Sequence, residues 1–251
     1  LPSPVLVIRD DALEHNIRLM ADYCAARDVS IAPHAKTTMA PLIIDRQMEA
    51  GAWGMTAATW RQASILRTHG VRRILIANQV LDPRGVEWIA DALVADEELD
   101  LYVLADSADG VRRMQEGLRA QGATRTLNML VEVGIAGKRA GTRTDDDAKA
   151  VVQEVQNSPQ LQLAGVECFE GVLASDDAVD ALLERVLGVA QAVEEMGGFQ
   201  DVSEIVLSAG GSVYFDRVIA SFGQASARLS LPVRTVLRSG CYVTHDSGVY
   251  D

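Results

Sequence analysis

The sequence lacks the segments that would direct a protein into a membrane or out of the cell. No uninterrupted apolar run among its 251 residues approaches the roughly 20 that a membrane-spanning helix needs. Arg9, Asp10 and Asp11 interrupt the early apolar run, unlike in a signal peptide. Only three cysteines are present, and their wide spacing fits neither a disulfide framework nor a zinc ribbon. We therefore expect a protein of the reducing cytoplasm.

Positive charge is scarce as well. The chain has 23 lysines and arginines against 35 aspartates and glutamates, for a formal net charge of −12. A surface of this sign does not favour contact with nucleic acid or with an anionic membrane, so we expect neither as a partner. The hydrophobic fraction of 48% nevertheless fits a folded globular domain with one substantial core.

Apolar segments alternate with helical patterns along the chain. The clearest helical patterns cover residues 145–155 and 178–196, and Asp82 before Pro83, together with Ser107 or Asp109, are start signals. The predicted strands are centred on Ile31, Met55, Leu75, Val103, Leu130, Val166, Val206 and Val236. Eight such strands with helices between them predict an α/β fold, a (β/α)8 barrel of the TIM type.

The N-terminal residues add two expectations. Asp11 and Glu14 have the spacing of a capping box, which predicts that a helix begins there and serves as the eighth barrel helix. Val5 to Ile8 then form a ninth strand, for which the barrel has no place.

A lysine follows the first predicted barrel strand, in the sequence His34-Ala35-Lys36. TIM-type barrels carry their chemistry at the carboxyl ends of the strands, and a partly buried lysine there can lose its proton and attack a carbonyl group. The simpler interpretation is a solvated loop lysine.

Gly210-Gly211-Ser212 follows the predicted seventh strand, and Gly240 follows the eighth. Consecutive backbone N–H groups at these ends can bind a phosphate, although Gly-Gly also marks ordinary turns.

Taken together, several motifs resemble those of the fold-type III pyridoxal-phosphate enzymes, whose barrel is of the alanine racemase N-terminal domain kind. The resemblance is greatest to the branch of D-serine dehydratase (deaminase) and D-threonine aldolase. The motifs, in chain order, are Pro33 to Met39, Arg46-Gln47, Gly51 to Gly54, Arg139-Ala140-Gly141, Phe169-Glu170-Gly171, Gly210-Gly211-Ser212 and Arg238 to Tyr242.

The resemblance implies roles for individual residues. Lys36 is the implied Schiff-base lysine and the base that removes the Cα proton. Arg139 would approach the cofactor ring, with a rim salt bridge to Glu132 or Asp145 as the alternative. His34 would position ring substituents or be structural. The implied phosphate site comprises Gly210, Gly211, Ser212, Gly240, Cys241 and Tyr242.

Two acidic residues and one aromatic residue of these motifs receive no role. Phe169 stands where relatives often have tyrosine, so it has no acid or base function. The orientation of Glu167 and Glu170 does not follow from the sequence.

The implied activity is that of a lyase that uses pyridoxal 5'-phosphate and acts on a small D-3-hydroxy amino acid. Deamination of D-serine to pyruvate and ammonia is the favoured reaction. Cleavage of D-threonine to glycine and acetaldehyde, racemisation, and a non-catalytic role in pyridoxal-phosphate homeostasis stay open.

The resemblance also implies a second domain that this chain does not contain. Residues 1–10 would join a missing β-domain, residues 11–240 form the barrel that binds pyridoxal phosphate, and residues 241–251 begin the connection to the C-terminal β-domain. The full-length enzyme would be a homodimer and use a divalent metal, zinc or manganese, held by ligands outside this chain. His245 and Asp246 are adjacent and do not suit chelation, so no metal ligand is assigned.

Overall fold

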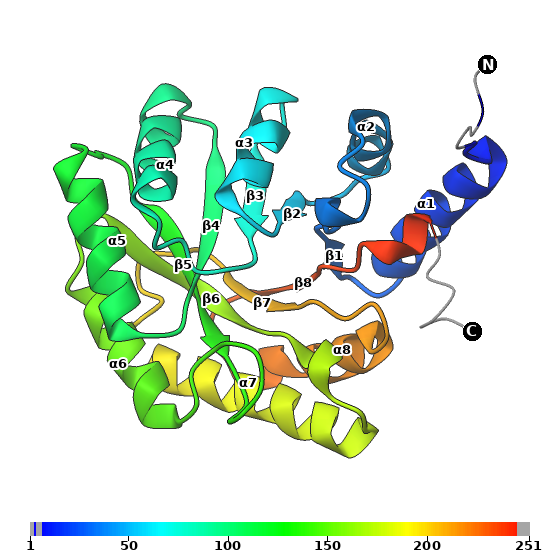
Figure 1. Ribbon diagram of the computed structural model, residues 1–251. Coiled ribbons are helices and arrows are strands. Elements are labelled where there is room, and N and C mark those ends of the chain that lie inside the picture. Colours follow the sequence, from blue (N-terminus) through cyan, green and yellow to red (C-terminus); the bar gives the residue numbers. More distant parts are fainter. Residues whose placement is uncertain (1–2, 4–6, 245–251) are drawn as a thin grey trace.

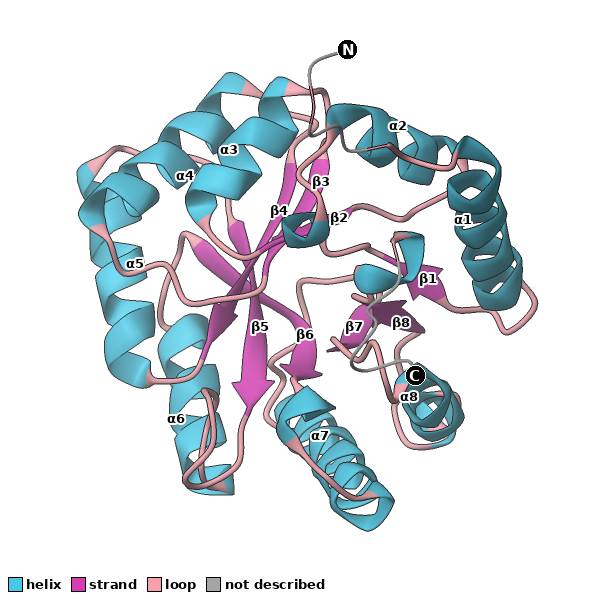
Figure 2. Ribbon diagram, turned by 45° about the vertical axis from the view of Figure 1, so that its right-hand side comes forward, coloured by secondary structure: helices cyan, strands magenta, loops and turns pink. Residues whose placement is uncertain are grey.

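The computed structural model describes residue 3 and residues 7–244, in which parallel strands form the centre and helices surround them (Figures 1 and 2). Each strand of this described part contains one of the predicted strand centres, which confirms the predicted alternation. The strands are β1 (Ser30–Ile31), β2 (Met55–Ala57), β3 (Arg73–Ile76), β4 (Asp100–Ala105), β5 (Leu127–Val133), β6 (Leu161–Cys168), β7 (Ile205–Ala209) and β8 (Val233–Leu237).

The strands pair in the order β1-β8-β7-β6-β5-β4-β3-β2, and every pairing is parallel. The two ends of this order also meet. His34 and Thr56 form a parallel bridge, and Trp53 N–H donates to the carbonyl of Ile31 at 2.8 Å. The sheet therefore curls into the predicted TIM-type barrel.

Among the described residues one α-helix precedes the first strand and the others lie between successive strands, as the alternation predicts. Asp82 and Ser107 both act as N-caps, and their side chains accept hydrogen bonds from Arg84 N–H and Gly110 N–H. The α-helices of the described residues are α1 (Asp10–Ala25), α2 (Pro41–Glu49), α3 (Trp60–Thr68), α4 (Pro83–Ala95), α5 (Ala108–Ala120), α6 (Asp145–Gln156), α7 (Asp176–Glu195) and α8 (Phe215–Phe222). No helix of the described residues is long and apolar enough to cross a membrane.

The predicted capping box at the start of α1 is wrong. The helix begins at Asp10, and the capping residue, Arg9, makes no side-chain cap hydrogen bond. Glu14 instead accepts a hydrogen bond from Arg18, one turn later. The acidic side chains of the first turn form ion pairs instead, Asp11 with Arg9 and Asp10 with Arg46.

The predicted ninth strand falls largely outside the described residues. Val5 and Leu6 are not described, while Val7 and Ile8 are exposed and belong to no strand. Their assignment to a second domain stays a prediction.

Apolar side chains fill the barrel on both sides of the strands, because successive residues of a strand point to opposite faces. The outer set packs under the helices. The inner set is smaller and includes Leu75, Leu104, Leu130, Val206 and Val236. Because the strands are parallel, the residues that follow them all lie at one end of the barrel, the carboxyl end.

Candidate functional site

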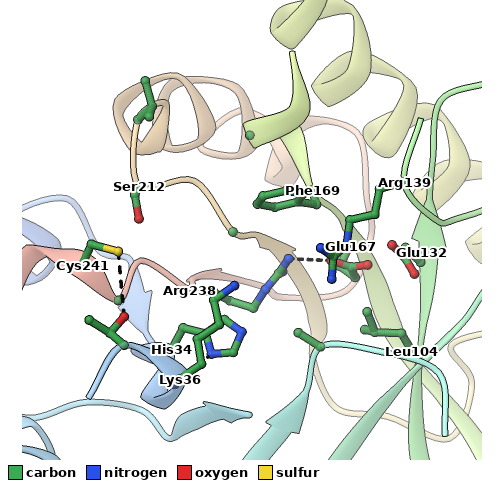
Figure 3. A pocket seen from close by; sticks show the side chains of 16 residues that line it. His34, Lys36, Leu104, Glu132, Arg139, Glu167, Phe169, Ser212, Arg238 and Cys241 are labelled. Atoms are coloured by element: carbon green, nitrogen blue, oxygen red, sulfur yellow. Dashed lines mark hydrogen bonds and ion pairs between the residues drawn. The ribbon is translucent and has the colours of Figure 1, made fainter. Parts of the chain in front are cut away.

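A pocket of about 220 Å³ opens at the carboxyl ends of the strands. Most of the predicted site residues line it, namely His34, Lys36, Arg139, Gly210, Ser212, Gly240 and Cys241. In Figure 3, Ser212 and Cys241 lie on one side of the pocket and Glu132 and Leu104 on the other, with Lys36, His34 and Arg238 between them. The structure thus brings together residues separated by more than 200 positions in the sequence.

Lys36 lies in a short 3-10 helix, η1 (Ala35–Thr37), directly after β1. The cap of this helix is His34, whose Nδ1 accepts a hydrogen bond from Lys36 N–H at 3.4 Å. Partial burial lowers the pKa of the Lys36 amine, and the positive charges of Arg139 and Arg238 lower it further. The neutral, nucleophilic form is therefore favoured relative to an ordinary lysine.

His34 is a neutral imidazole in this setting. Burial, followed by the charges of Lys36 and Arg238, lowers its pKa to about 3. It adds no positive charge beside Lys36 at neutral pH, so its contribution to the pocket is shape and hydrogen bonding.

Arg238 is a central residue of the pocket to which the sequence assigned no role. It is 4% exposed and lies between Lys36 and Glu167 in Figure 3. Its guanidinium donates to Glu167 Oε2 at 2.7 Å, to Ser208 Oγ at 2.6 Å and to the Cys168 carbonyl at 3.0 Å. The available signal was an arginine immediately after an apolar strand, in the motif that contains Gly240.

Three buried carboxyl groups line or underlie the pocket near β5 and β6. Glu132, Glu167 and Glu170 are all at most 5% exposed, and burial is the main cause that raises the pKa of each. Gln79 donates a hydrogen bond to Glu132. One oxygen of Glu167 and one of Glu170 have no hydrogen-bond partner among the described residues. A buried polar atom of this kind has the capacity to bind a ligand or a proton.

The glycine loop after β7 contacts Glu170 and the loop after β8. Gly210 N–H donates to Glu170 Oε2 at 3.2 Å, and the Gly211 carbonyl accepts from Ser239 Oγ at 2.6 Å. The N–H groups of Gly211 and Ser212 donate to no acceptor in the described part of the chain. They are therefore available to an anion.

Gly240 allows the loop after β8 to pack against the lysine segment. A Cβ at this position would lie 2.6 Å from the His34 carbonyl oxygen and 2.8 Å from Thr37 Oγ1. The next residue, Cys241, places its sulfur 3.9 Å from the same Thr37 hydroxyl. A side chain at position 240 would separate these two loops.

Tyr242 lies apart from the other predicted phosphate residues. Its hydroxyl accepts a hydrogen bond from Gln47 Nε2 at 2.9 Å, and its ring packs beside Leu13, Ile17 and Ile43. Burial raises the pKa of the phenol to about 12. The side chain thus faces α1 and α2, and it is not part of the pocket lining.

Arg139 reaches the pocket from the loop after β5. Its guanidinium lies 5.6 Å from the centre of the Phe169 ring. The alternative rim salt bridge does not form among the described residues, because Asp145 pairs with Arg185 and Glu132 bonds to Gln79. Arg143 fixes this loop by donating to the carbonyls of Ile135, Lys138, Arg139 and Ala140.

Comparison with known proteins gives one family match and several relatives. The family model described as "Alanine racemase, N-terminal domain" matches residues 8–245. D-threonine aldolase from Arthrobacter sp is 28% identical over 170 residues, which are 67% of this chain and 43% of that protein. D-threo-3-hydroxyaspartate dehydratase from Delftia sp. (strain HT23) is 26% identical over 253 residues, or 98% of this chain and 62% of that protein.

Solved structures agree with these matches. The crystal structure of D-threonine aldolase from Filomicrobium marinum superposes with a TM-score of 0.77 at 25% identity, covering 98% of this chain and 63% of that one. The chain therefore spans about two fifths to just over three fifths of the length of the relatives described here.

Proposed function

Because this chain belongs to the family of alanine racemase N-terminal domains, we propose that it is the cofactor-binding barrel of a pyridoxal-phosphate-dependent lyase that acts on small D-3-hydroxy amino acids. One observation carries the proposal: Lys36, with its lowered pKa, and the glycine loop line one pocket, and the Gly211 and Ser212 N–H groups of that loop meet no acceptor among the described residues. Pyridoxal phosphate needs an amine for its aldehyde and N–H donors for its phosphate.

The residues present fit this cofactor. The N–H groups of Gly211 and Ser212 and the loop at Gly240 would hold the phosphate, and Lys36 would bind the aldehyde carbon. A Cβ on Gly210 would lie 3.0 Å from the Phe169 ring and 3.2 Å from Arg238, so glycine keeps this wall of the pocket open. Arg238 supplies a fixed positive charge in the same pocket.

The chain's own residues would handle the protons of the reaction. Pyridoxal phosphate, when bound, withdraws electrons from the Cα atom of an attached amino acid. Lys36 would be the base for the Cα proton, because its lowered pKa keeps more of the amine neutral than in an ordinary lysine. His34 beside it has a lowered pKa and does not take up this proton at neutral pH.

Two substrates within this class are supported by different observations. The Thr37-Thr38-Met39 segment resembles that of deaminase-like members, which favours loss of water from D-serine. The relative from Arthrobacter is a D-threonine aldolase, which supports cleavage of D-threonine as the second candidate. The two reactions differ in the bond broken, Cβ–O in the first and Cα–Cβ in the second.

A divalent metal belongs to the proposal as well. Expulsion of a β-hydroxyl is easier when a metal acts as Lewis acid. A solved structure of a D-threo-3-hydroxyaspartate dehydratase mutant is described as being in the metal-free form, which supports the use of a metal in such enzymes. Among the described residues there is no group of three or more His, Cys, Asp or Glu side chains suited to a metal. We propose that the ligands lie outside them.

Binding and turnover test the proposal separately. Equilibrium dialysis should show that the chain binds pyridoxal phosphate more tightly than pyridoxal, which lacks the phosphate. The protein should then be offered D-serine and D-threonine with their L-enantiomers as controls, with and without a chelator, while pyruvate and acetaldehyde are measured. If the chain binds neither pyridoxal phosphate nor pyridoxal, the cofactor assignment is refuted. Formation of one product alone would identify the reaction.

A further inference from the structure

A buried carboxyl group lies directly against the glycine loop. Glu170, in the 3-10 helix η2 (Glu170–Val172), is 0% exposed, and its Oε2 accepts the hydrogen bond from Gly210 N–H. A Cβ on Gly211 would lie only 1.7 Å from its Oε1, so the loop follows the surface of this carboxyl group. Oε1 has no hydrogen-bond partner in the described part of the chain.

This position conflicts with the binding of a phosphate by the same loop. A phosphate monoester carries close to two negative charges above its second pKa, which is about 6. An ionised Glu170 would repel that dianion, and it already occupies one of the loop's N–H donors. The conflict disappears when the carboxyl group carries a proton.

We propose that Glu170 is a positioning residue that must be protonated while the glycine loop holds a phosphate monoester, so that binding takes up one proton at this carboxyl group. The proposal rests on the proposed function, because the phosphate is taken to be that of the cofactor. The proton comes from solvent and neutralises Glu170, whose unpartnered oxygen can then donate a hydrogen bond.

The surroundings of Glu170 already favour the protonated form. Burial raises its pKa, while hydrogen bonds from the backbone N–H groups of Glu170 and Gly210 and the positive charge of Arg238, after β8, oppose this rise. The titratable groups of β6 nearby are Glu167 and Cys168, and Glu170 raises the pKa of both. The Cys168 pKa is raised well above its ordinary value, so this thiol stays neutral. A bound dianion would raise the pKa of Glu170 further.

The ratio of the affinity for pyridoxal phosphate to the affinity for pyridoxal measures the effect of Glu170 on phosphate binding. Pyridoxal phosphate and pyridoxal share the aldehyde that reacts with Lys36, so dividing one affinity by the other removes the titration of that lysine. Between about pH 7 and pH 9 the phosphate is a dianion throughout. Once Glu170 is ionised in the free protein, the ratio should fall by up to about tenfold per pH unit.

Two variants separate Glu170 from other carboxylates. Glu170→Gln keeps the shape and is uncharged, so it should flatten the pH dependence of the ratio and bind the phosphate form more tightly at high pH. Glu184→Gln is the matched control, because Glu184 is an exposed carboxylate of α7 paired with Arg228. That variant should keep the wild-type slope.

Calorimetry of wild-type protein gives a readout that needs no variant. At a pH at which Glu170 is ionised in the free protein, titration in two buffers of different ionisation enthalpy should show that pyridoxal phosphate takes up about one more proton than pyridoxal does. Inorganic phosphate, titrated well above its own second pKa so that it is a dianion throughout, tests the loop without any aldehyde and should show the same uptake.

The outcomes are distinguishable. Loss of binding for both aldehydes would refute the proposed function, while the inorganic phosphate titration would still decide the role of Glu170. Binding of both aldehydes with a ratio independent of pH would overturn the role of Glu170 and leave the cofactor site standing. A wild-type slope that persists in Glu170→Gln would overturn it as well. If that variant does not fold, the proton uptake of the wild-type protein decides.

Discussion

A guanidinium nitrogen of Arg238 lies 2.7 Å from Glu167 Oε2, and these two side chains, 4% and 1% exposed, line the same pocket as Lys36. The pair joins β6 to the loop after β8, two elements separated by β7. Ser208 of β7 completes the connection by accepting a second hydrogen bond from Arg238. A charged pair therefore ties together three consecutive strands directly beneath the pocket.

Replacing Arg238 with methionine should destabilise the fold by about 3–5 kcal/mol at high pH, because Glu167 is left as a buried charge without a partner. Burial already raises the Glu167 pKa, and loss of the arginine raises it further. The variant should therefore lose stability as pH rises and recover it as Glu167 takes up a proton. Urea unfolding at acidic and alkaline pH measures this.

The control for that change is Arg228→Met, which breaks an exposed pair with Glu184 and should change the stability little, because solvent screens the pair. Adding Glu167→Gln to Arg238→Met should restore part of the stability. A loss of equal size at both pH values would contradict the account.

Lys36 should carry the covalent link to the cofactor. The sequence has only three lysines, the others being Lys138 and Lys149, so the assignment is simple to test. Borohydride reduction in the presence of pyridoxal phosphate, followed by peptide mapping, should label Lys36. Lys36→Ala should abolish the label, while Lys138→Ala and Lys149→Ala should keep it. Labelling of either other lysine in the wild-type protein would refute the role of Lys36.

Arg139 should control the pH at which Lys36 reacts. After burial, its positive charge is the main cause that lowers the Lys36 pKa, so removing it should raise that pKa. In Arg139→Gln, the rate of covalent attachment of pyridoxal should therefore need a higher pH to reach half its maximum. Lys138→Gln removes an exposed positive charge from the same loop and should leave the midpoint unchanged. A shift to lower pH in Arg139→Gln would contradict the electrostatic assignment.

Gly211→Ala should weaken binding of pyridoxal phosphate at least tenfold, or about 1.4 kcal/mol. The added Cβ would lie 1.7 Å from Glu170 Oε1, so the loop or the carboxyl group must move. Gly188→Ala is the matched control, because a Cβ there meets no atom within 4 Å and lies in the middle of α7. That change should leave binding unaltered and stabilise the protein by up to about 1 kcal/mol. Dialysis and thermal unfolding report the two effects.

The parts of the fold that the sequence predicted are those governed by local patterns. Strand centres and helix starts such as Asp82 and Ser107 depend on residues a few positions away, and they were confirmed. Placement of Lys36 in the pocket also follows from local order, because it comes directly after a barrel strand.

The parts that escaped prediction depend on contacts between distant strands. Arg238 meets Glu167 because the register of the sheet sets Glu167 beside Ser208 and Ser208 beside Val236. No pattern along the chain encodes that register. For the same reason, the sequence did not reveal that Tyr242 turns toward Gln47 and away from the pocket.

The strand that presents Lys36 is among the least secured in the barrel. β1 is two residues long and pairs with β8 through two residue pairs. On its other side, the contact with the β2 region consists of the His34–Thr56 bridge and a few hydrogen bonds, among them Trp53 N–H to the Ile31 carbonyl. Backbone amides along this seam should exchange with heavy water sooner than those of the long central strand β5. A ligand attached to Lys36 and held by the loops after β7 and β8 would link the two sides of this seam. Loss of the cofactor would then increase local opening at this seam. Resistance to proteolysis should therefore rise with the fraction of molecules that have cofactor bound.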